Sequence, residues 1–445
     1  MTFSFEEIYA RKNYMTPYKE EGRVIETKGM AYRVSLKNAS LGSKIKFINE
    51  DGRSGIGEVV GLAVDSCIVM PYHEISSINS KTKVQCEQIT NNVNVCPELL
   101  GRVIDAFGEP IDGKGPIKSF FKEEKSLNGK QINPLSRPPI TEALNFGVRS
   151  IDSFITIGKG QRMSILAGSG IGKSVLLGMM AKNSSAQVNV IALVGERGRE
   201  VREFIENDLG SEGLKRSVVI VATSDTGPLV RLRAAYTATT VAEYFRDRQN
   251  DVLLMMDSVT RFAMAAREIS LSAGEPPGQK GYSPSVFARL PKLLERAGRV
   301  ENSGSITGIY TVLVEGGDMD EPITDAIRAI SDGHIQLSRE LAAKNHYPAI
   351  DILNSISRVM NNVVTREHQI VVGHLRDLMS AYIDSEDLIN VGAYVQGTNP
   401  RVDKAIKIYD ELMQFMRQAQ SEEVGGDIQY VFDRLIEIAR KAESN

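Results

Sequence analysis

The sequence is poor in three features that would each indicate a particular class of protein. It has only three cysteines, Cys67, Cys86 and Cys96, and no C-x-x-C pair, so we expect neither a disulfide framework nor a zinc site. No stretch approaches the roughly 20 apolar residues that a membrane-spanning helix requires. The formal net charge of −3 provides no broad basic field of the kind that attracts nucleic acid or an anionic membrane.

The start of the chain also lacks the features of a secretion signal. The first residues, M-T-F-S-F-E-E-I-Y-A, carry acids where a signal peptide has a basic start and an apolar run. We therefore expect a cytoplasmic protein that reaches the inner face of the cytoplasmic membrane only through partners. We expect no nucleic-acid partner.

The length of 445 residues predicts two or three domains. Residues 1–20 are mixed polar and aromatic and are interpreted as an N-terminal arm. Residues 21–96 contain short β-rich runs cut by turn signals such as Asn49–Gly52, which predicts a small β-barrel domain. Residues 97–365 are then an α/β domain, and residues 366–445, with amphipathic spacing, a helical domain.

Within the α/β domain, the segment 101–140 is rich in turn formers, and we expect a connection with little regular structure. From residue 148 to residue 358, near-continuous apolar runs alternate with helical patterns. The runs are M-S-I-L-A, N-V-I-A-L-V, S-V-V-I-V-A-T, D-V-L-L-M-M-D and T-G-I-Y-T-V-L-V-E. They predict a parallel sheet covered by helices on both faces, with functional residues at the carboxyl ends of the strands.

The strongest motif is A-G-S-G-I-G-K-S at Ala167–Ser174, which follows one of these runs and opens a helix. Its glycines let backbone N–H groups turn inward around phosphate oxygens, and the helix N-terminus adds a positive dipole end. Lys173 can reach the β- and γ-phosphates, and the Ser174 hydroxyl can ligate Mg²⁺. Ala167 replaces the usual first glycine, and the alternative is a glycine-rich turn with a chance Lys-Ser pair. The expected ATP-binding residues are Gly168, Ser169, Gly170, Ile171, Gly172, Lys173, Ser174 and Val175.

Two acidic residues and two arginines complete the candidate chemistry. Asp257 ends an apolar run, where an acid can hold Mg²⁺ through its water shell or cap the next helix. Glu196, in G-E-R-G-R-E, is placed to orient a water toward the γ-phosphate, and Arg197 to stabilise the transferred charge, unless this is a solvated loop. Arg358, in S-I-S-R, is either an arginine finger for a neighbour's site or an ordinary surface arginine.

The chain from about residue 101 to residue 360 resembles the catalytic subunits of the rotary ATPase family. The runs G-E-R-G-R-E-V-R-E-F, M-D-S-V-T-R-F-A-M-A and G-E-P-P-G-Q-K-G-Y-S-P-S-V-F point to the branch that serves bacterial flagellar and type III protein export. The runs L-P-K-L-L-E-R-A-G, Y-T-V-L-V-E-G-G-D-M-D-E-P-I and N-H-Y-P-A-I-D-I-L-N-S-I-S-R-V-M point the same way.

The resemblance implies an N-terminal β-barrel, a central RecA-like domain with a P-loop and a parallel sheet, and a C-terminal helical domain. It implies Mg-dependent ATP hydrolysis in a ring, usually a hexamer, with ATP bound between neighbouring subunits. By this resemblance Lys173 and Ser174 match the phosphate-loop positions, Asp257 matches the Mg-site acid, and Glu196 matches the catalytic carboxylate.

The resemblance also assigns residues at the edge of the site. Arg197 matches the γ-phosphate arginine and Arg358 the finger donated across the interface. Tyr347 matches the aromatic residue that packs on adenine, and Tyr394 is a weaker candidate for the same pocket. Since one chain carries both Glu196 and Arg358, six equivalent sites in a homohexamer are expected.

The expected partners follow from the resemblance as well. The Gly- and Pro-rich segment Gly274–Phe287, around Lys280 and Tyr282, faces the central pore in the family, where a stalk protein or export substrate lies; the alternative is a plain connecting loop. Residues 1–20 resemble loosely the arm that binds a regulatory, stator-like protein. Export substrates, their chaperones and the export gate at the membrane complete the expected set.

Three rival interpretations compete with flagellar protein export. The virulence injectisome ATPase differs little in sequence pattern. An ATP synthase catalytic subunit would carry D-E-L-S-E-E-D, whereas only I-D-S-E-D-L occurs at Ile383–Leu388, and G-E-R-G-R-E-V-R replaces G-E-R-T-R-E-G. An RNA-translocating helicase would need a basic barrel with stacking aromatics, but residues 22–95 hold only Tyr32, Phe47 and Tyr72 and no basic stripe.

Overall fold

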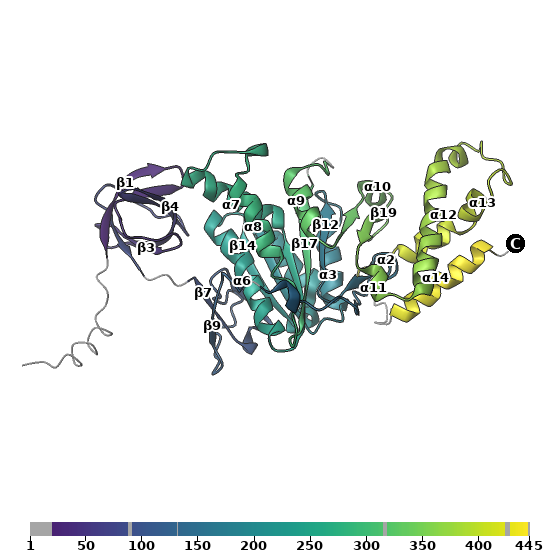
Figure 1. Cartoon of the computed structure of the whole chain (residues 1–445), viewed down its shortest axis with the longest axis horizontal. Coiled ribbons are helices and arrows are strands. Elements are labelled where there is room, and N and C mark those ends of the chain that lie inside the picture. The colour runs from purple at the N-terminus through teal and green to yellow at the C-terminus, as the bar shows by residue number, and fades with distance from the viewer. Residues whose placement is uncertain (1–19, 88–90, 131, 315–317, 423–427, 444–445) are drawn as a thin grey trace, which may run out of the picture. The chain divides into compact units, whose positions relative to one another are not determined.

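The computed structural model of the chain describes residues 20–87, 91–130, 132–314, 318–422 and 428–443 (Figure 1). The chain divides into two compact units. The first holds residues up to 92 together with 226–230 and 265–283, and the second holds the remainder. The expected N-terminal arm, residues 1–20, lies outside the described residues except for its last position.

The first unit contains a closed barrel of six strands in the order β1-β2-β5-β4-β3-β6, with every neighbouring pair antiparallel. Alternate residues point inward, so Ile45 and Phe47 of one strand are fully buried together with Val69 and Val84. The barrel expected from the sequence is therefore confirmed. Its strands are β1 (Glu21–Lys28), β2 (Ala31–Val34), β3 (Lys44–Ile48), β4 (Ser54–Ala63), β5 (Ser66–Pro71) and β6 (Lys83–Cys86).

The second unit is built on a nine-stranded sheet whose main path runs β19-β18-β12-β17-β15-β13-β14-β8. All neighbours on this path are parallel except β18 and β19, and the short β16 pairs antiparallel with β17. The parallel core confirms the expected α/β fold. The strands are β8 (Arg102–Asp105), β12 (Arg162–Ala167), β13 (Val188–Glu196), β14 (Ser217–Thr223), β15 (Asp251–Asp257), β16 (Gly298–Arg299), β17 (Ser305–Leu313), β18 (Gly333–Leu337) and β19 (Ile350–Ser357).

The segment 101–140 differs from its expected form as a plain connection. Its strand β8 forms the far edge of the main sheet, and β9 (Glu123–Ser126) pairs with β7 (Asn92–Val95). Only Val103 and Ile104 of β8 are buried, and turn-forming residues stand on both sides. A strand this short gives too little apolar pattern to be distinguished from a loop.

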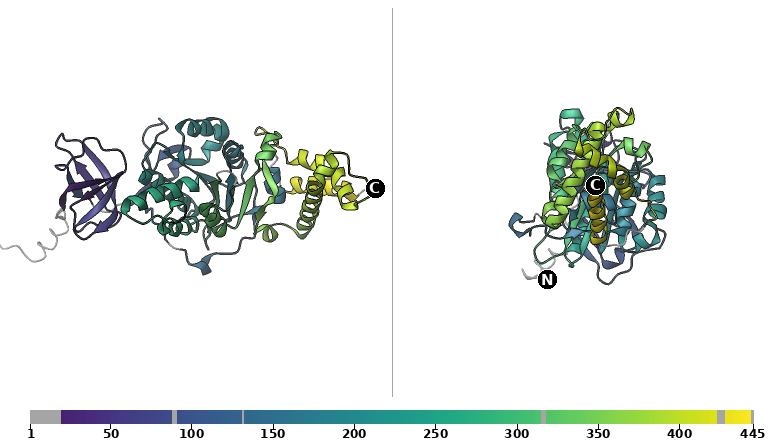
Figure 2. Two further views of the ribbon diagram at one scale, coloured as in Figure 1. Left: turned by 90° about the horizontal axis from the view of Figure 1, so that it is seen from above. Right: turned by 90° about the vertical axis from the view of Figure 1, so that its right-hand side faces the viewer.

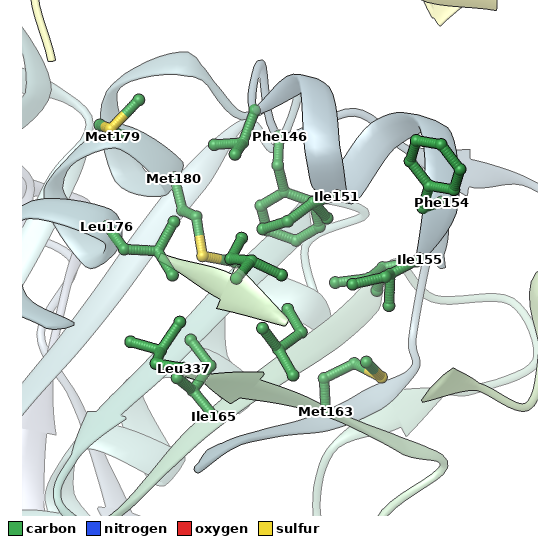
Figure 3. Close-up of a cluster of buried hydrophobic side chains, with 14 of the residues drawn as sticks. Phe146, Ile151, Phe154, Ile155, Met163, Ile165, Leu176, Met179, Met180 and Leu337 are labelled. Atoms are coloured by element: carbon green, nitrogen blue, oxygen red, sulfur yellow. The ribbon is translucent and has the colours of Figure 1, made fainter. Parts of the chain in front are cut away.

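Helices connect the strands and pack along the sheet (Figure 1). Figure 3 shows part of the core beneath the phosphate-binding motif, where Met163 and Ile165 of β12 gather with Ile151 of α2 and with Leu176 and Met180 of α3. The helices of this unit include α2 (Arg149–Phe154), α3 (Lys173–Asn183), α4 (Gly198–Glu203), α5 (Gly210–Lys215), α6 (Pro228–Arg246), α7 (Val259–Ala273), α8 (Pro284–Leu294), α9 (Pro322–Ile330), α10 (Arg339–Ala343) and α11 (Met360–Val363), with parts of α6 and α7 in the first unit.

The C-terminal part is helical, as the sequence predicts. Its helices α12 (Arg366–Asn390), α13 (Pro400–Met416) and α14 (Ile428–Glu443), yellow-green to yellow in Figures 1 and 2, pack against one another. Their buried residues continue the core cluster of the sheet through α2. No described helix combines the length and apolar character needed to cross a bilayer.

Candidate nucleotide-binding site

The phosphate-binding motif forms the turn between β12, which ends at Ala167, and α3, which begins at Lys173. Gly170 and Gly172 adopt left-handed backbone angles, with φ of +77° and +83°, so glycine is required at both positions. The turn leaves the first N–H groups of α3 without backbone partners in the helix, as an anion-binding loop needs. Residue 167 is buried at the strand end, and its extra methyl group is accommodated in the core.

Two acidic side chains meet Lys173 at the carboxyl edge of the sheet. Because β13 and β15 are parallel neighbours, their last residues, Glu196 and Asp257, come to the same edge. The Lys173 Nζ lies 2.5 Å from Asp257 Oδ1 and 3.7 Å from Glu196 Oε1. The Thr311 hydroxyl donates to Asp257 Oδ1 at 2.7 Å and fixes that carboxylate. All three charged side chains are at most 13% exposed.

Burial and neighbouring charges shift the pKa values of Glu196 and Lys173. Burial and the charge of Asp257 raise the pKa of Glu196 to about 7, although Lys173 acts in the opposite direction. Burial alone would lower the pKa of Lys173, but the attraction of Asp257 and Glu196 outweighs burial, and the pKa is raised. Lys173 is therefore a cation at neutral pH, while Glu196 can gain or lose a proton there.

A cavity of about 580 Å³ lies at the phosphate loop and is lined by most of the expected site residues. Seven of the eight expected loop residues line it, while Ile171 is buried in the core. Glu196 and Arg197 line it too. Arg197 is 77% exposed and pairs with Glu200 at 3.0 Å, so its side chain stands at the rim.

The two tyrosines expected to contact adenine lie in different surroundings. Tyr347 precedes this strand, and a Cβ built on Gly172 would meet the Tyr347 ring at 3.2 Å, which places the ring beside the loop. Tyr394 does not line the cavity. Its hydroxyl instead bonds to Asp403 Oδ1 and to the backbone oxygen of Asn399, both at 3.0 Å.

Arg358 lies away from the cavity of its own chain. It follows β19, whose last residue Ser357 pairs with Gly333 at the start of β18. In the next strand, Ser164 of β12 pairs with His334, so Gly333 lies beside residue 163 of β12. Arg358 is therefore about four residues, or roughly 13 Å, from the end of β12 where the phosphate loop begins. The Arg358 side chain donates to the backbone oxygen of Ser331 at 3.3 Å.

Two further arginines line the cavity that were not among the expected residues, Arg261 and Arg339. Arg261 follows the end of β15 by four residues, and its side chain passes Gly195, where a Cβ would meet it at 3.0 Å. Arg339 follows the end of β18 by two residues. The rule that functional residues gather at the carboxyl ends of parallel strands could have found Arg261, which follows an expected strand, but not Arg339, because β18 was not among the expected strands.

The segment Gly274–Phe287 connects α7 to α8 and includes the first residues of α8. Its residues Gln279–Gly281 form a 3₁₀ turn, with Lys280 exposed at φ +48°, and α8 begins at Pro284. Tyr282 is only 4% exposed, because its ring packs beneath the Arg267 guanidinium at 5.0 Å. Lys280 thus faces solvent, whereas Tyr282 belongs to the core of the first unit.

A phosphate-binding loop with its lysine, joined to two strand-end carboxylates on a parallel sheet, defines a P-loop nucleotide hydrolase. Comparison with known proteins agrees with this class. Residues 147–357 match the model of the ATP synthase alpha/beta family nucleotide-binding domain, and residues 364–428 match that of the T3SS EscN ATPase C-terminal domain.

Individual similar proteins identify the family within this class of nucleotide hydrolases. The chain is 53% identical to the flagellum-specific ATP synthase of Bacillus subtilis over 91% of this chain and 92% of that protein. It is 48% identical to the type 3 secretion system ATPase of Xanthomonas euvesicatoria, over 89% of each. The structure of the assembled ATPase EscN from the enteropathogenic E. coli type III secretion system matches with a TM-score of 0.89 at 42% identity, over 94% of this chain and all of that one. The chain belongs to the family of flagellum-specific ATP synthases and type III secretion ATPases, and it is an ATP-hydrolysing enzyme.

Proposed function

We propose that the chain hydrolyses Mg-ATP as part of a homohexameric ring and that this hydrolysis energises protein export through the flagellar type III secretion apparatus. The observation that carries the ring is the position of Arg358. Lys173, which contacts Asp257, and Glu196 line the cavity, whereas Arg358 lies about 13 Å of strand away from the loop. A finger arginine so placed serves the site of a neighbouring subunit.

The flagellar assignment is favoured by the similar proteins. Flagellum-specific ATP synthases of Bacillus subtilis, Treponema pallidum and Pseudomonas aeruginosa are 48–53% identical to this chain over about nine tenths of its length. The match of residues 364–428 to the EscN-type C-terminal model favours protein export over ion-translocating ATP synthesis.

The residues of the site fit ATP and Mg²⁺ in distinct ways. Within the described residues no group of three or more His, Cys, Asp or Glu side chains forms a metal site. Mg²⁺ in nucleotide sites is usually held by one or two protein oxygens together with phosphate oxygens and water. Ser174 and Asp257 would hold the ion, which when bound neutralises charge on the phosphates. Lys173 would contact the β- and γ-phosphates.

The other side chains take the remaining roles in this proposal. Glu196, buried beside Lys173, orients the attacking water and accepts its proton. Arg197 at the rim stabilises charge on the transferred phosphoryl group, and Arg358 of the neighbouring subunit completes the site. Tyr347, beside Gly172, packs on adenine.

The proposed partners of this chain are inferred from similar proteins of the same family. EscN has been solved in complex with its central stalk EscO, and this similar structure supports a stalk protein in the pore of the ring proposed here. Lys280, exposed on its 3₁₀ turn, is our candidate contact with that stalk. Residues 1–20 would bind the regulatory partner. Export substrates, chaperones and the membrane export gate would hold this cytoplasmic ATPase at the inner face of the membrane.

ATPase activity per chain should rise with protein concentration, because each site needs a residue from a neighbour. Steady-state hydrolysis would be measured from nanomolar to micromolar protein, with light scattering on the same samples to report the mass. We expect activity and ring mass to rise together. Constant activity per chain in samples that remain monomeric would disprove the shared site.

The rate should also depend on pH through Glu196. A carboxylate that accepts a proton is active when ionised, and its pKa is raised to about 7. The turnover number kcat should therefore fall roughly tenfold for each pH unit below 7 and level off above it. Because contact with Glu200 contributes to the raised pKa, Glu200→Gln should move the midpoint to lower pH. A profile that is flat between pH 6 and 8 would exclude Glu196 as the base.

A further inference from the structure

The Arg339 side chain lies against the phosphate loop at Gly168, where the absence of a side chain leaves room for the guanidinium. A Cβ built on Gly168 would meet the Arg339 guanidinium at 2.9 Å (Nη2) and 3.0 Å (Nε), and all three nearest atoms belong to that group. Gly168, unlike Gly170 and Gly172, does not have a left-handed backbone. Glycine is therefore needed at 168 to admit the arginine and not to shape the turn.

The charge of Arg339 is available to a ligand. Its side chain is exposed, and among the described residues it has no hydrogen-bond or ion-pair partner. Its backbone is fixed, because the hydroxyl of Ser338 caps the turn by accepting from the Leu341 amide at 3.2 Å and the Ser338 amide bonds to Ala349 at 2.8 Å. The other rim arginine, Arg197, is by contrast engaged with Glu200.

The order of strands places Arg339 on a particular side of the loop. In the sheet, β18 and β19 lie on one side of β12, and β17, β15 and β13 lie on the other. Arg339 and Tyr347 come from the first side, whereas Asp257 and Glu196 come from the second. Arg339 thus stands on the side of the expected adenine contact, away from the carboxylates where the terminal phosphate is cleaved.

We infer that Arg339 binds the part of the phosphate chain that ATP and ADP share, and that it acts as a positioning residue for the nucleotide. A guanidinium presents parallel N–H donors that match two phosphate oxygens, and an unpaired arginine at the mouth of a phosphate cavity is suited to that contact. The inference rests on the nucleotide site proposed above and adds a residue to it.

The test is nucleotide binding by the full chain, measured by titration with fluorescent ADP and with a fluorescent non-hydrolysable ATP analogue in the presence of Mg²⁺. Arg339→Ala should raise Kd for both nucleotides by about tenfold. Arg339→Lys should recover part of this loss, and kcat at saturating ATP should change less than about threefold. Arg366→Ala, which removes an exposed arginine whose side chain bonds to Gln369 and to no other described residue, is the matched control and should bind normally.

Lys173→Ala separates failure of the inference from failure of the site. If Lys173→Ala weakens binding but Arg339→Ala does not, Arg339 has no role in binding. If Arg339→Ala weakens ATP alone, the contact lies on the terminal phosphate and the placement is wrong. If Lys173→Ala also leaves both affinities unchanged, the proposed nucleotide site is itself wrong.

A double-mutant cycle tests the contact between Gly168 and Arg339. Gly168→Ala should weaken binding several-fold in the parent chain, because the methyl group displaces the guanidinium. In the Arg339→Ala background the same methyl group should cost little, so the two effects should not add. Fully additive effects would show that Gly168 and Arg339 act independently and would overturn the contact.

Discussion

Mixing inactive Glu196→Gln chains with inactive Arg358→Ala chains should restore ATPase activity. Each variant alone should lose about a thousandfold in kcat, since one lacks the carboxylate that orients water and the other lacks the finger. In a ring assembled at random from equal amounts, about a quarter of the interfaces combine an intact Glu196 with an intact Arg358. Activity should therefore approach a quarter of that of the parent enzyme.

The mixing experiment has two controls built from the same chain. Doubling the concentration of either variant alone should restore nothing. Arg434→Ala, which removes an exposed arginine that pairs with Glu437 on its own helix, should retain full activity. If the mixture remains inactive although mixed rings form, Glu196 and Arg358 do not act in one shared site.

Replacing Lys173 by alanine should lower kcat/KM for ATP by about 100- to 1000-fold. The substitution removes the cation nearest to the phosphate position and leaves Glu196 and Asp257 without the charge that separates them. The pKa of Glu196 should rise further, because Lys173 lowers it in the parent chain. Steady-state kinetics at pH 8, with thermal unfolding to check the fold, measure the effect.

Lys182→Ala provides the matched control for Lys173→Ala. Lys182 lies on the same helix, and its amino group donates a long hydrogen bond of 3.4 Å to the Asn207 backbone oxygen. Its removal should leave kcat/KM within about twofold of the parent value. Similar losses in the two variants would indicate that the helix, and not the charge of Lys173, is what matters.

The sequence predicts most of the core because the relevant signals are local. The run S-V-V-I-V-A-T coincides with β14 at 217–223, and D-V-L-L-M-M-D coincides with β15 at 251–257. Strands buried on both faces carry continuous apolar runs, and the rule that sites form at their carboxyl ends then brings Glu196 and Asp257 to the loop. The 2.5 Å contact of Lys173 with Asp257 is consistent with that expectation.

The features missed by sequence analysis depend on contacts between distant segments. β8 has too few apolar residues to be distinguished from the turns beside it. Arg339 resembles an ordinary surface arginine until the sheet places it at the cavity. Tyr282 was grouped with Lys280, but packing beneath Arg267 buries the one and leaves the other exposed. No local pattern distinguishes these cases.

The strand β19 has a consequence for cooperation between subunits. Tyr347 precedes it, beside the loop of its own chain, and Arg358 follows it at the opposite end. β19 pairs with β18 near both of its ends, at 350–351 and at 356–357, with an irregularity between them. In the proposed ring, a nucleotide that displaces Tyr347 before β19 would also displace the finger after it, because this strand connects the two residues. Occupancy of one site would then alter turnover at the next, so ATP hydrolysis should show a sigmoidal dependence on ATP concentration.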